Sequence, residues 1–112
     1  MSNLVNLRDH RRRQPVVRFD RAELMRLLQM YSQRVARGEW RDYAIDMGPG
    51  AATFSVFRST HETPLFAISK VGGASARNGK YKVFCGPRIL KQGADLGEVL
   101  KVFEAKLIKL KR

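Results

Sequence analysis

Apolar residues recur at helical spacing in the first third of the chain. A single face of a helix that begins at Asp20 would carry Leu24, Leu27, Leu28, Tyr31 and Val35. Asp20 and Glu23 have the spacing of a capping box, in which each side chain accepts a hydrogen bond from the other residue's backbone N–H. Gly38 can adopt the left-handed conformation that ends many helices. The pattern therefore predicts an amphipathic helix between Asp20 and Gly38.

In the middle of the chain the hydrophobic period changes to simple alternation, which is typical of strands. We expect strands at Tyr43–Met47, over the β-branched and aromatic run 52–59, at Leu65–Val71 and at Lys80–Cys85, with a brief fifth extended piece around Arg88–Lys91. The segment Gly72–Gly79 is rich in small residues, and we expect a flexible hairpin loop there, ending in an Asn-Gly turn.

A second amphipathic helix is expected after the last strand. Asp95 and Glu98 repeat the capping spacing. One apolar stripe then contains Leu96, Val99, Leu100, Phe103, Leu107 and Leu110. This order predicts an α+β domain over residues 18–112: helix, about four antiparallel strands, helix, with both helices on one face of the sheet. Residues 1–17 lack sustained periodicity, and we expect them to form a basic, mobile arm.

The net charge points to a polyanionic partner. Twenty-two Lys and Arg residues against ten Asp and Glu residues give a formal charge of +12. The excess lies mainly in residues 1–19, with five basic residues against one acidic, and in residues 48–92, with seven against one. No apolar run is long enough to span a membrane, and the charged start lacks the apolar core of a secretory signal. With Cys85 as the one cysteine, we expect a cytoplasmic protein without membrane contact.

The glycine-rich segment does not have the spacing of a nucleotide-phosphate loop. A Walker loop needs four residues between its outer glycines, and a Lys followed by Ser or Thr. Here five residues separate Gly73 from Gly79, and Tyr81 follows Lys80. We therefore interpret this segment as a connection whose Arg77 and Lys80 are placed to touch a phosphate backbone.

The remaining reactive residues do not form a metal or catalytic site by their spacing. His10, His61 and Cys85 are too few for zinc, which needs about four ligands. One enzymatic alternative is a Cys85–His61 pair, which lacks an orienting third group. The other is acid–base work by Asp42 or Asp46 near Trp40, but the charges around Arg41 favour a solvated cluster there. We therefore expect a non-enzymatic protein without cofactor or metal. Trp40 is expected to pack the helix end onto the sheet, with a role as a binding aromatic as the alternative.

The strands suggest a face on which aromatic and cationic side chains alternate. We expect the helix-covered face to carry Phe54, Val56, Leu65, Ala67, Val71, Tyr81, Val83 and Cys85. Alternation then sends to the opposite face Phe57, Phe66, Lys70, Lys80, Lys82 and Phe84. Rings on which bases stack, interleaved with cations that meet phosphates, are typical of proteins that hold single-stranded nucleic acid. The alternative is that the three phenylalanines form a small second core under the arm or under a dimer partner.

These features favour a nucleic-acid-binding module, with single-stranded RNA or DNA preferred. The run Arg11, Arg12 and Arg13 would add phosphate contacts from the arm. The alternative function is a protein-interaction or regulatory module, which would bind an acidic protein or form a homodimer through the open sheet face or Trp40.

Three strings in the chain resemble those of a family of small bacterial proteins classed as a domain of unknown function. They are FDRAEL at 19–24, GEWRDYAID at 38–46 and FSVFR at 54–58. The likeness runs from about Phe19 through the second predicted helix and leaves the arm outside. It implies a bacterial, cytosolic, single-domain protein, and it carries no activity, cofactor or site residues.

Overall fold

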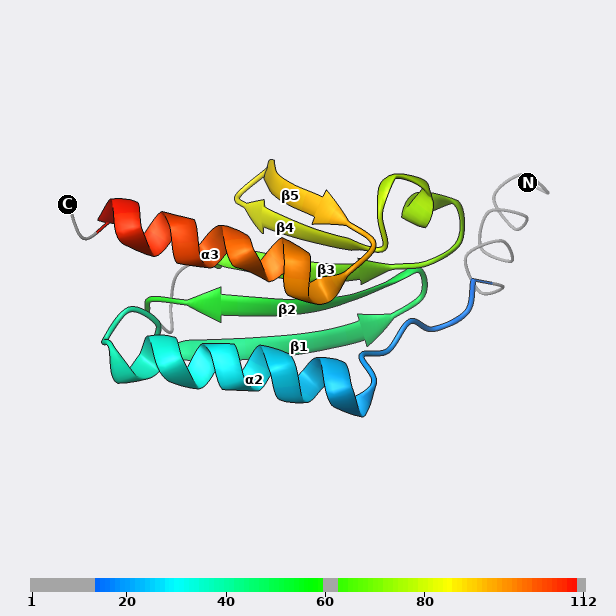
Figure 1. The fold of residues 1–112 in the computed structure, drawn as a ribbon. Helices are drawn as coiled ribbons and strands as arrows, with labels where there is room; N and C mark the ends of the chain where they lie inside the picture. The colour runs from blue at the N-terminus through cyan, green and yellow to red at the C-terminus, as the bar shows by residue number, and fades with distance from the viewer. Residues whose placement is uncertain (1–13, 60–62, 111–112) are drawn as a thin grey trace.

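A computed structural model describes residues 14–59 and 63–110 of the chain. Two long helices flank a five-stranded sheet in the sequence, and a short 3₁₀ helix interrupts the strands (Figure 1). The elements are α2 (Arg21–Ala36), β1 (Asp42–Gly48), β2 (Ala51–Phe57), β3 (Phe66–Val71), η1 (Gly73–Asn78), β4 (Tyr81–Cys85), β5 (Arg88–Gly93) and α3 (Leu96–Leu110). Every strand pairs antiparallel with the next in the order β1-β2-β3-β4-β5. The predicted α+β class is confirmed, with five strands where about four were expected.

Helix α2 begins as the sequence predicts, and four of the five predicted apolar residues face the core: Leu27 is buried, and Leu24, Leu28 and Tyr31 pack against the core. Asp20 is the N-cap, and its capping box with Glu23 is complete. The buried stripe consists of Glu23, Leu27, Met30 and Arg34. Val35, which was expected on the buried face, is 40% exposed. The prediction was wrong for Val35, and it missed Glu23, Met30 and Arg34, because two of the four buried positions hold charged side chains.

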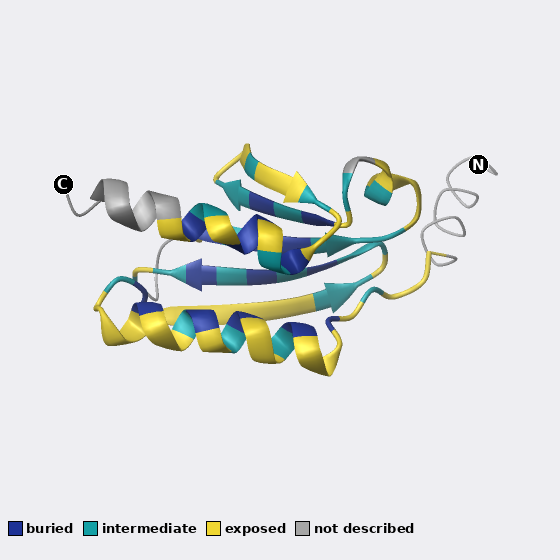
Figure 2. Cartoon of the chain, in the orientation of Figure 1, coloured by how far each residue is buried: buried dark blue, intermediate teal, exposed yellow. Residues whose placement is uncertain are grey.

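Aromatic rings join both long helices to the sheet. Tyr31 of α2 packs edge-on to Phe54 of β2, and Phe103 of α3 packs edge-on to Phe66 of β3, with centroids 6.4 and 5.0 Å apart. Trp40, 5% exposed, contacts Phe103 at 5.4 Å, so it belongs to the core and not to a binding surface. Figure 2 shows the buried residues as dark bands along β2, β3 and β4, and on the sides of the helices nearest the sheet.

The side-chain orientation predicted for β3 is wrong by one residue. Phe66 pairs with Val56, and Ile68 pairs with Phe54 and Val83. Residues paired directly across an antiparallel sheet share a face. Phe66, Ile68 and Lys70 therefore lie on the same face as Phe54, here called the inner face. Ala67 and Val71, predicted to be on the inner face, alternate to the other side, here called the outer face.

Two connecting segments also differ from expectation. The predicted flexible loop contains the 3₁₀ helix η1. Gly79 follows it with φ +130°, and a Cβ there would lie 2.6 Å from the backbone nitrogen of Gly93. Residues 15–17, assigned to the arm, pair with the β1–β2 turn: Val17 N–H donates to the carbonyl of Gly48 over 2.9 Å. Within the described ranges, no helix is long and apolar enough to cross a membrane.

Candidate nucleic-acid interface

Lys70 is part of a buried ion pair on the inner face, so it is not a residue of the predicted binding face. Its Nζ lies 2.8 Å from Glu23 Oε1 and donates over 2.8 Å to the backbone carbonyl of Arg18. The Tyr81 hydroxyl donates to the other oxygen of the same carboxylate. The side chains of Lys70 and Glu23 are only 13% and 9% exposed. This Glu23–Lys70–Tyr81 cluster fastens the start of α2 to β3 and β4.

Hydrogen bonding dominates the electrostatics of that cluster. Burial alone would raise the pKa of Glu23, but hydrogen bonds from Lys70, Tyr81 and the backbone of Asp20 together lower it below the usual 4.5. Burial, the hydrogen bond to Glu23 and its negative charge all raise the pKa of Tyr81. The carboxylate is therefore ionised and the phenol neutral at pH 7, so each hydrogen bond keeps a proper donor and acceptor. Their partners are all within the chain, which makes the cluster a structural anchor.

Phe66 is the second residue that must be removed from the predicted site. It is 7% exposed and packs between Trp40 and Phe103. The sequence pattern misplaced it because Leu65 was taken as the first inward residue of the strand. A run with apolar residues at both parities does not fix its own register, and here the pairing with Val56 decides it.

Three predicted residues do lie on the outer face. Lys82 and Phe84 alternate with the buried Val83 of β4, and Phe57 alternates with the buried Val56 of β2. All three are partly exposed. Strands β2 and β4 are two strand spacings, or roughly 10 Å, apart. The two rings therefore lie on separate parts of the outer face and cannot both contact one small planar group.

Small and hydroxylic residues lie beside Phe84 on the outer face. Ala67 of β3 is paired with Ser55 on one side and Phe84 on the other. Thr53 and Ser69 share a side-chain hydrogen bond of 3.0 Å in the next row of the sheet. Phe57 lies one same-face position beyond Ser55, and Ser69 is 8% exposed.

Arg77 and Lys80 lie close to the point where β4 begins. Arg77 is in the last turn of η1. Lys80 immediately precedes β4, and its Nζ lies 5.8 Å from the centroid of the Tyr81 ring. Both side chains are exposed. They therefore place positive charge at the end of the strand that carries Lys82 and Phe84. Arg11, Arg12 and Arg13 lie outside the described residues.

Strand β1 limits the basic part of the outer face. Asp42 pairs with Phe57 and Asp46 pairs with Thr53, so both carboxylates lie on that face at its β1 edge. Both aspartates are exposed to solvent, so neither is a desolvated carboxylate of the kind that acid–base work would need. A polyanion would be repelled from this edge and attracted towards β4.

The structure adds one residue to the candidate interface that the sequence pattern did not reveal. Ile89 of β5 pairs with Phe84 and is 47% exposed, so it extends the apolar surface beside that ring. The β4–β5 hairpin could have revealed it, since Gly86 and Pro87 are a turn signal between two extended segments. However, a β-bulge between Val83 and Phe84 shifts the register of β4 against β5, and simple alternation does not predict this shift.

No group of three or more His, Cys, Asp or Glu side chains in the described ranges is arranged to hold a metal ion. Cys85 is partly buried against the core. His61, its predicted partner in a nucleophilic pair, lies outside the described residues.

The fold is thus a small α+β domain with an antiparallel five-stranded sheet and a basic, aromatic part on its outer face. The chain belongs to the family DUF2794, described as a protein of unknown function, whose model matches residues 17–100. The predicted resemblance to a domain of unknown function is confirmed. Comparison with curated proteins and with solved structures gave no significant match.

Proposed function

We propose that this protein is a non-enzymatic nucleic-acid-binding module that holds single-stranded RNA or DNA on the outer face of its sheet. The observation that carries the proposal is the placement of Lys82 and Phe84 side by side on β4, with Phe57 two strands away. Bases would stack on the two rings, and phosphates would meet Lys82, Lys80 and Arg77. Single strands are favoured because a duplex does not expose the faces of its bases.

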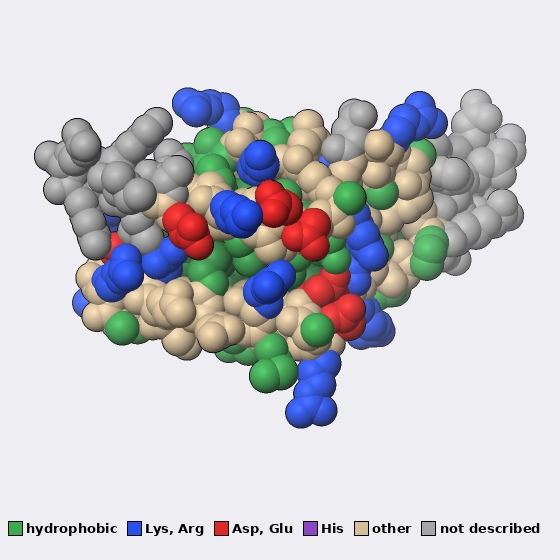
Figure 3. All heavy atoms as spheres, in the orientation of Figure 1, with side chains coloured by type: hydrophobic (Ala, Val, Ile, Leu, Met, Phe, Trp, Pro, Cys, Tyr) green, Lys and Arg blue, Asp and Glu red, His purple; other side chains and the backbone are tan. Residues whose placement is uncertain are grey.

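The distribution of charge supports this choice of face. The chain carries a net charge of +12, yet the helix side shown in Figure 3 has acidic side chains among its basic ones. Three of the acidic residues line the groove between α2 and α3: Asp95, Glu98 and Glu104. A polyanion would therefore meet more repulsion on that side than along β4. Among the described residues, the long helices contact the inner face through Phe54 and Phe66, and neither helix contact involves the outer-face residues Phe57, Lys82 and Phe84.

Fluorescence anisotropy tests the proposal with single-stranded RNA, single-stranded DNA and duplex DNA, each at low and near-physiological salt. We expect binding to a single strand that persists at the higher salt. Replacing Lys80 and Lys82 by alanine should flatten the plot of log affinity against log salt by about 0.7 to 0.9 for each phosphate that the variant no longer neutralises. Phe84→Ala should weaken binding at both salts without changing that slope, because stacking releases no counterions.

Lys101→Ala is the matched control. Lys101 is an exposed cation of α3, where its side chain is 65% exposed beside Glu98. Removing it changes the net charge as much as removing Lys82 but leaves the outer face intact. If Lys101→Ala weakens binding as much as Lys82→Ala, or if all binding disappears at the higher salt, the attraction is generic and the proposed site is wrong.

A second candidate function, self-association, is favoured by the edge of the sheet. Tyr43 and Ile45 of β1 are 40% and 38% exposed on the inner face, and β1 has no neighbour on its outer side in the described part of the chain. Edge strands are usually protected by lysine, proline or a bulge, none of which interrupts Asp42–Gly48. Antiparallel pairing of two copies about Ile45 would set Tyr43 opposite Met47 and Asp46 opposite Ala44, so that no two aspartates are directly opposite each other, although they are diagonal neighbours on the outer face. Light scattering after size exclusion tests self-association through β1. The wild type is expected to be a dimer and Ile45→Lys a monomer. A wild type that is monomeric at high concentration would refute this second function.

A further inference from the structure

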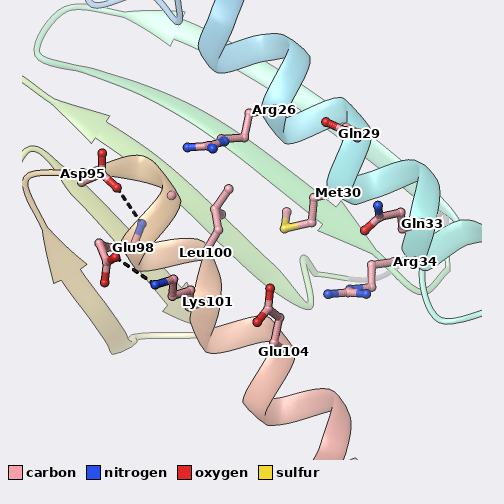
Figure 4. Close-up of a pocket in the computed structure, with 11 residues that line it drawn as sticks. Arg26, Gln29, Met30, Gln33, Arg34, Asp95, Glu98, Leu100, Lys101 and Glu104 are labelled. Carbon is pink, nitrogen blue, oxygen red and sulfur yellow. Dashed lines mark hydrogen bonds and ion pairs between the residues drawn. The ribbon is translucent and has the colours of Figure 1, made fainter.

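A polar groove lies between the two long helices, on the side of the molecule away from the proposed nucleic-acid interface. Its volume is about 490 Å³, which is within the size range of small-molecule sites. Figure 4 shows side chains from α2 and α3 facing each other across it. Met30 and Leu100, both buried, form its apolar floor.

Arg34 lies in this groove as a buried cation that has no partner among the described residues. It is 5% exposed, and its Nε atom has no hydrogen-bond acceptor. No carboxylate of the described residues forms an ion pair with its guanidinium. Glu104 lies across the groove on α3 (Figure 4), and Glu39 lies just beyond the end of α2. Burial lowers the pKa of Arg34, and the negative charges of these two residues oppose that shift without forming an ion pair. Glu39 Oε1 is also buried without a hydrogen-bond partner, so Glu39 is the internal competitor for Arg34. A buried charge without a partner is strongly unfavourable, so an anion is expected to occupy this position.

The other end of the groove is already occupied by the chain's own groups. The Arg26 guanidinium lies over the first turn of α3, where a Cβ on Gly97 would be 2.5 Å from one of its terminal nitrogens. The Asp95 carboxylate is beside it, 3.2 Å from the same point. Neither arginine forms an ion pair with a carboxylate of the described residues, but Arg26 is exposed to solvent whereas Arg34 is buried. Water can solvate the charge of Arg26, so Arg34 is the arginine of this groove for which a bound anion would matter most.

We propose that the α2–α3 groove binds a small molecule through an oxyanion, either carboxylate or phosphate, held by Arg34, with its apolar part over Met30 and Leu100. The planar guanidinium offers parallel N–H donors that match two oxygens of such a group. The acidic residues along α3 disfavour a highly charged ligand such as a nucleic-acid strand, which separates this site from the proposed nucleic-acid interface. The two sites lie on opposite sides of the sheet and do not depend on each other.

Thermal unfolding in inorganic phosphate or acetate, at constant ionic strength, tests the site. We expect one of the two anions to raise the unfolding midpoint in a saturable way, and the one that does identifies the chemistry of the group. Arg34→Gln should abolish this rise. Arg37→Gln is the matched control, since Arg37 is an exposed arginine three residues further along that carries the same charge. If neither anion stabilises the wild type, or if both variants respond alike, the proposal is overturned.

Nuclear magnetic resonance of the wild type keeps the test independent of whether Arg34→Gln folds. The Nε–H signal of Arg34 should move during the titration and reach a plateau, while the signals of exposed arginines move little. A shift shared by all arginines would indicate general screening and would contradict a site.

Two further variants distinguish an external anion from the chain's own carboxylates. Glu104→Gln should leave the unfolding midpoint almost unchanged without anion and should tighten anion binding roughly fivefold, the effect of removing one nearby like charge. Glu39→Gln should behave similarly. If either variant instead lowers stability and moves the Arg34 Nε–H signal before any anion is added, that carboxylate is the partner of Arg34 in solution and the groove needs no ligand.

Discussion

The buried Glu23–Lys70–Tyr81 cluster gives the sharpest prediction about stability. Glu23→Ala removes an ion pair whose side chains are 9% and 13% exposed, and it leaves the ammonium group of Lys70 with only the carbonyl of Arg18. Breaking a buried pair by removing one partner costs about 3–5 kcal/mol. The same change removes half of the capping box, worth about 1 kcal/mol, and leaves the Tyr81 hydroxyl without its acceptor, at about 1–3 kcal/mol.

These contributions overlap, because the same carboxylate makes all three contacts. We therefore expect Glu23→Ala to lower the free energy of unfolding by about 4 kcal/mol, near the middle of the range for a broken buried pair. Lys70→Met should cost less, since it leaves the carboxylate with the hydrogen bonds from Tyr81 and Asp20. The double variant should cost about 2 kcal/mol less than the sum of the single variants, because it leaves no buried charge unpaired.

Urea unfolding followed by tryptophan fluorescence measures these differences in unfolding free energy. Urea is uncharged, so it does not screen the ion pair. Trp40 is the one tryptophan in the chain and is 5% exposed, so its emission reports on exposure of the core. If the single variants add to within about 0.5 kcal/mol, the two side chains do not interact and the described ion pair is refuted. A cost below about 1 kcal/mol for Glu23→Ala would equally contradict its burial, because that is the range of an exposed pair.

The remaining predictions concern pH and two local backbone features. The folded-state pKa of Glu23 is lowered from 4.5, so its contribution to stability is complete above pH 4.5 and is lost as the pH falls through the lower folded-state pKa. In urea unfolding, Glu23→Gln should therefore lose less unfolding free energy in acid than the wild type does. Gly79→Ala should cost at least about 2 kcal/mol, since φ is +130° and the new Cβ would meet the backbone of Gly93. Gly86→Ala, with φ +60° and open space around it, should cost only about 1 kcal/mol; equal costs would exclude a clash. Asp95→Ala should cost about 1 kcal/mol in urea unfolding, because its carboxylate accepts from the N–H of Glu98 over 2.9 Å, and a neutral result would show that this cap is not stabilising.

The elements that the sequence predicted well depend on interactions over three or four residues. Asp20 with Glu23, and Asp95 with Glu98, begin their helices where the spacing indicates. Alternation in β2 and β4 also placed Phe54 and Val83 correctly, because small or polar residues separate the buried ones. The same alternation placed three residues of the candidate interface on the outer face: Phe57, Lys82 and Phe84. Arg77 and Lys80 lie outside the strands and are exposed.

Contacts between distant elements settled what the local pattern left open. The orientation of β3 follows from the pairing of Phe66 with Val56, between residues ten apart, and this pairing removed Phe66 and Lys70 from the predicted site. Lys70 is buried because Glu23, forty-seven residues earlier, supplies its counterion, and a hydrophobicity pattern cannot represent such compensation. The burial of Arg34 likewise depends on α2 and α3 lying side by side. The starts of helices and strands can be read from the chain because capping and alternation act between near neighbours. Which charged side chains are buried cannot be read in this way, because their burial depends on partners that only the folded arrangement brings together.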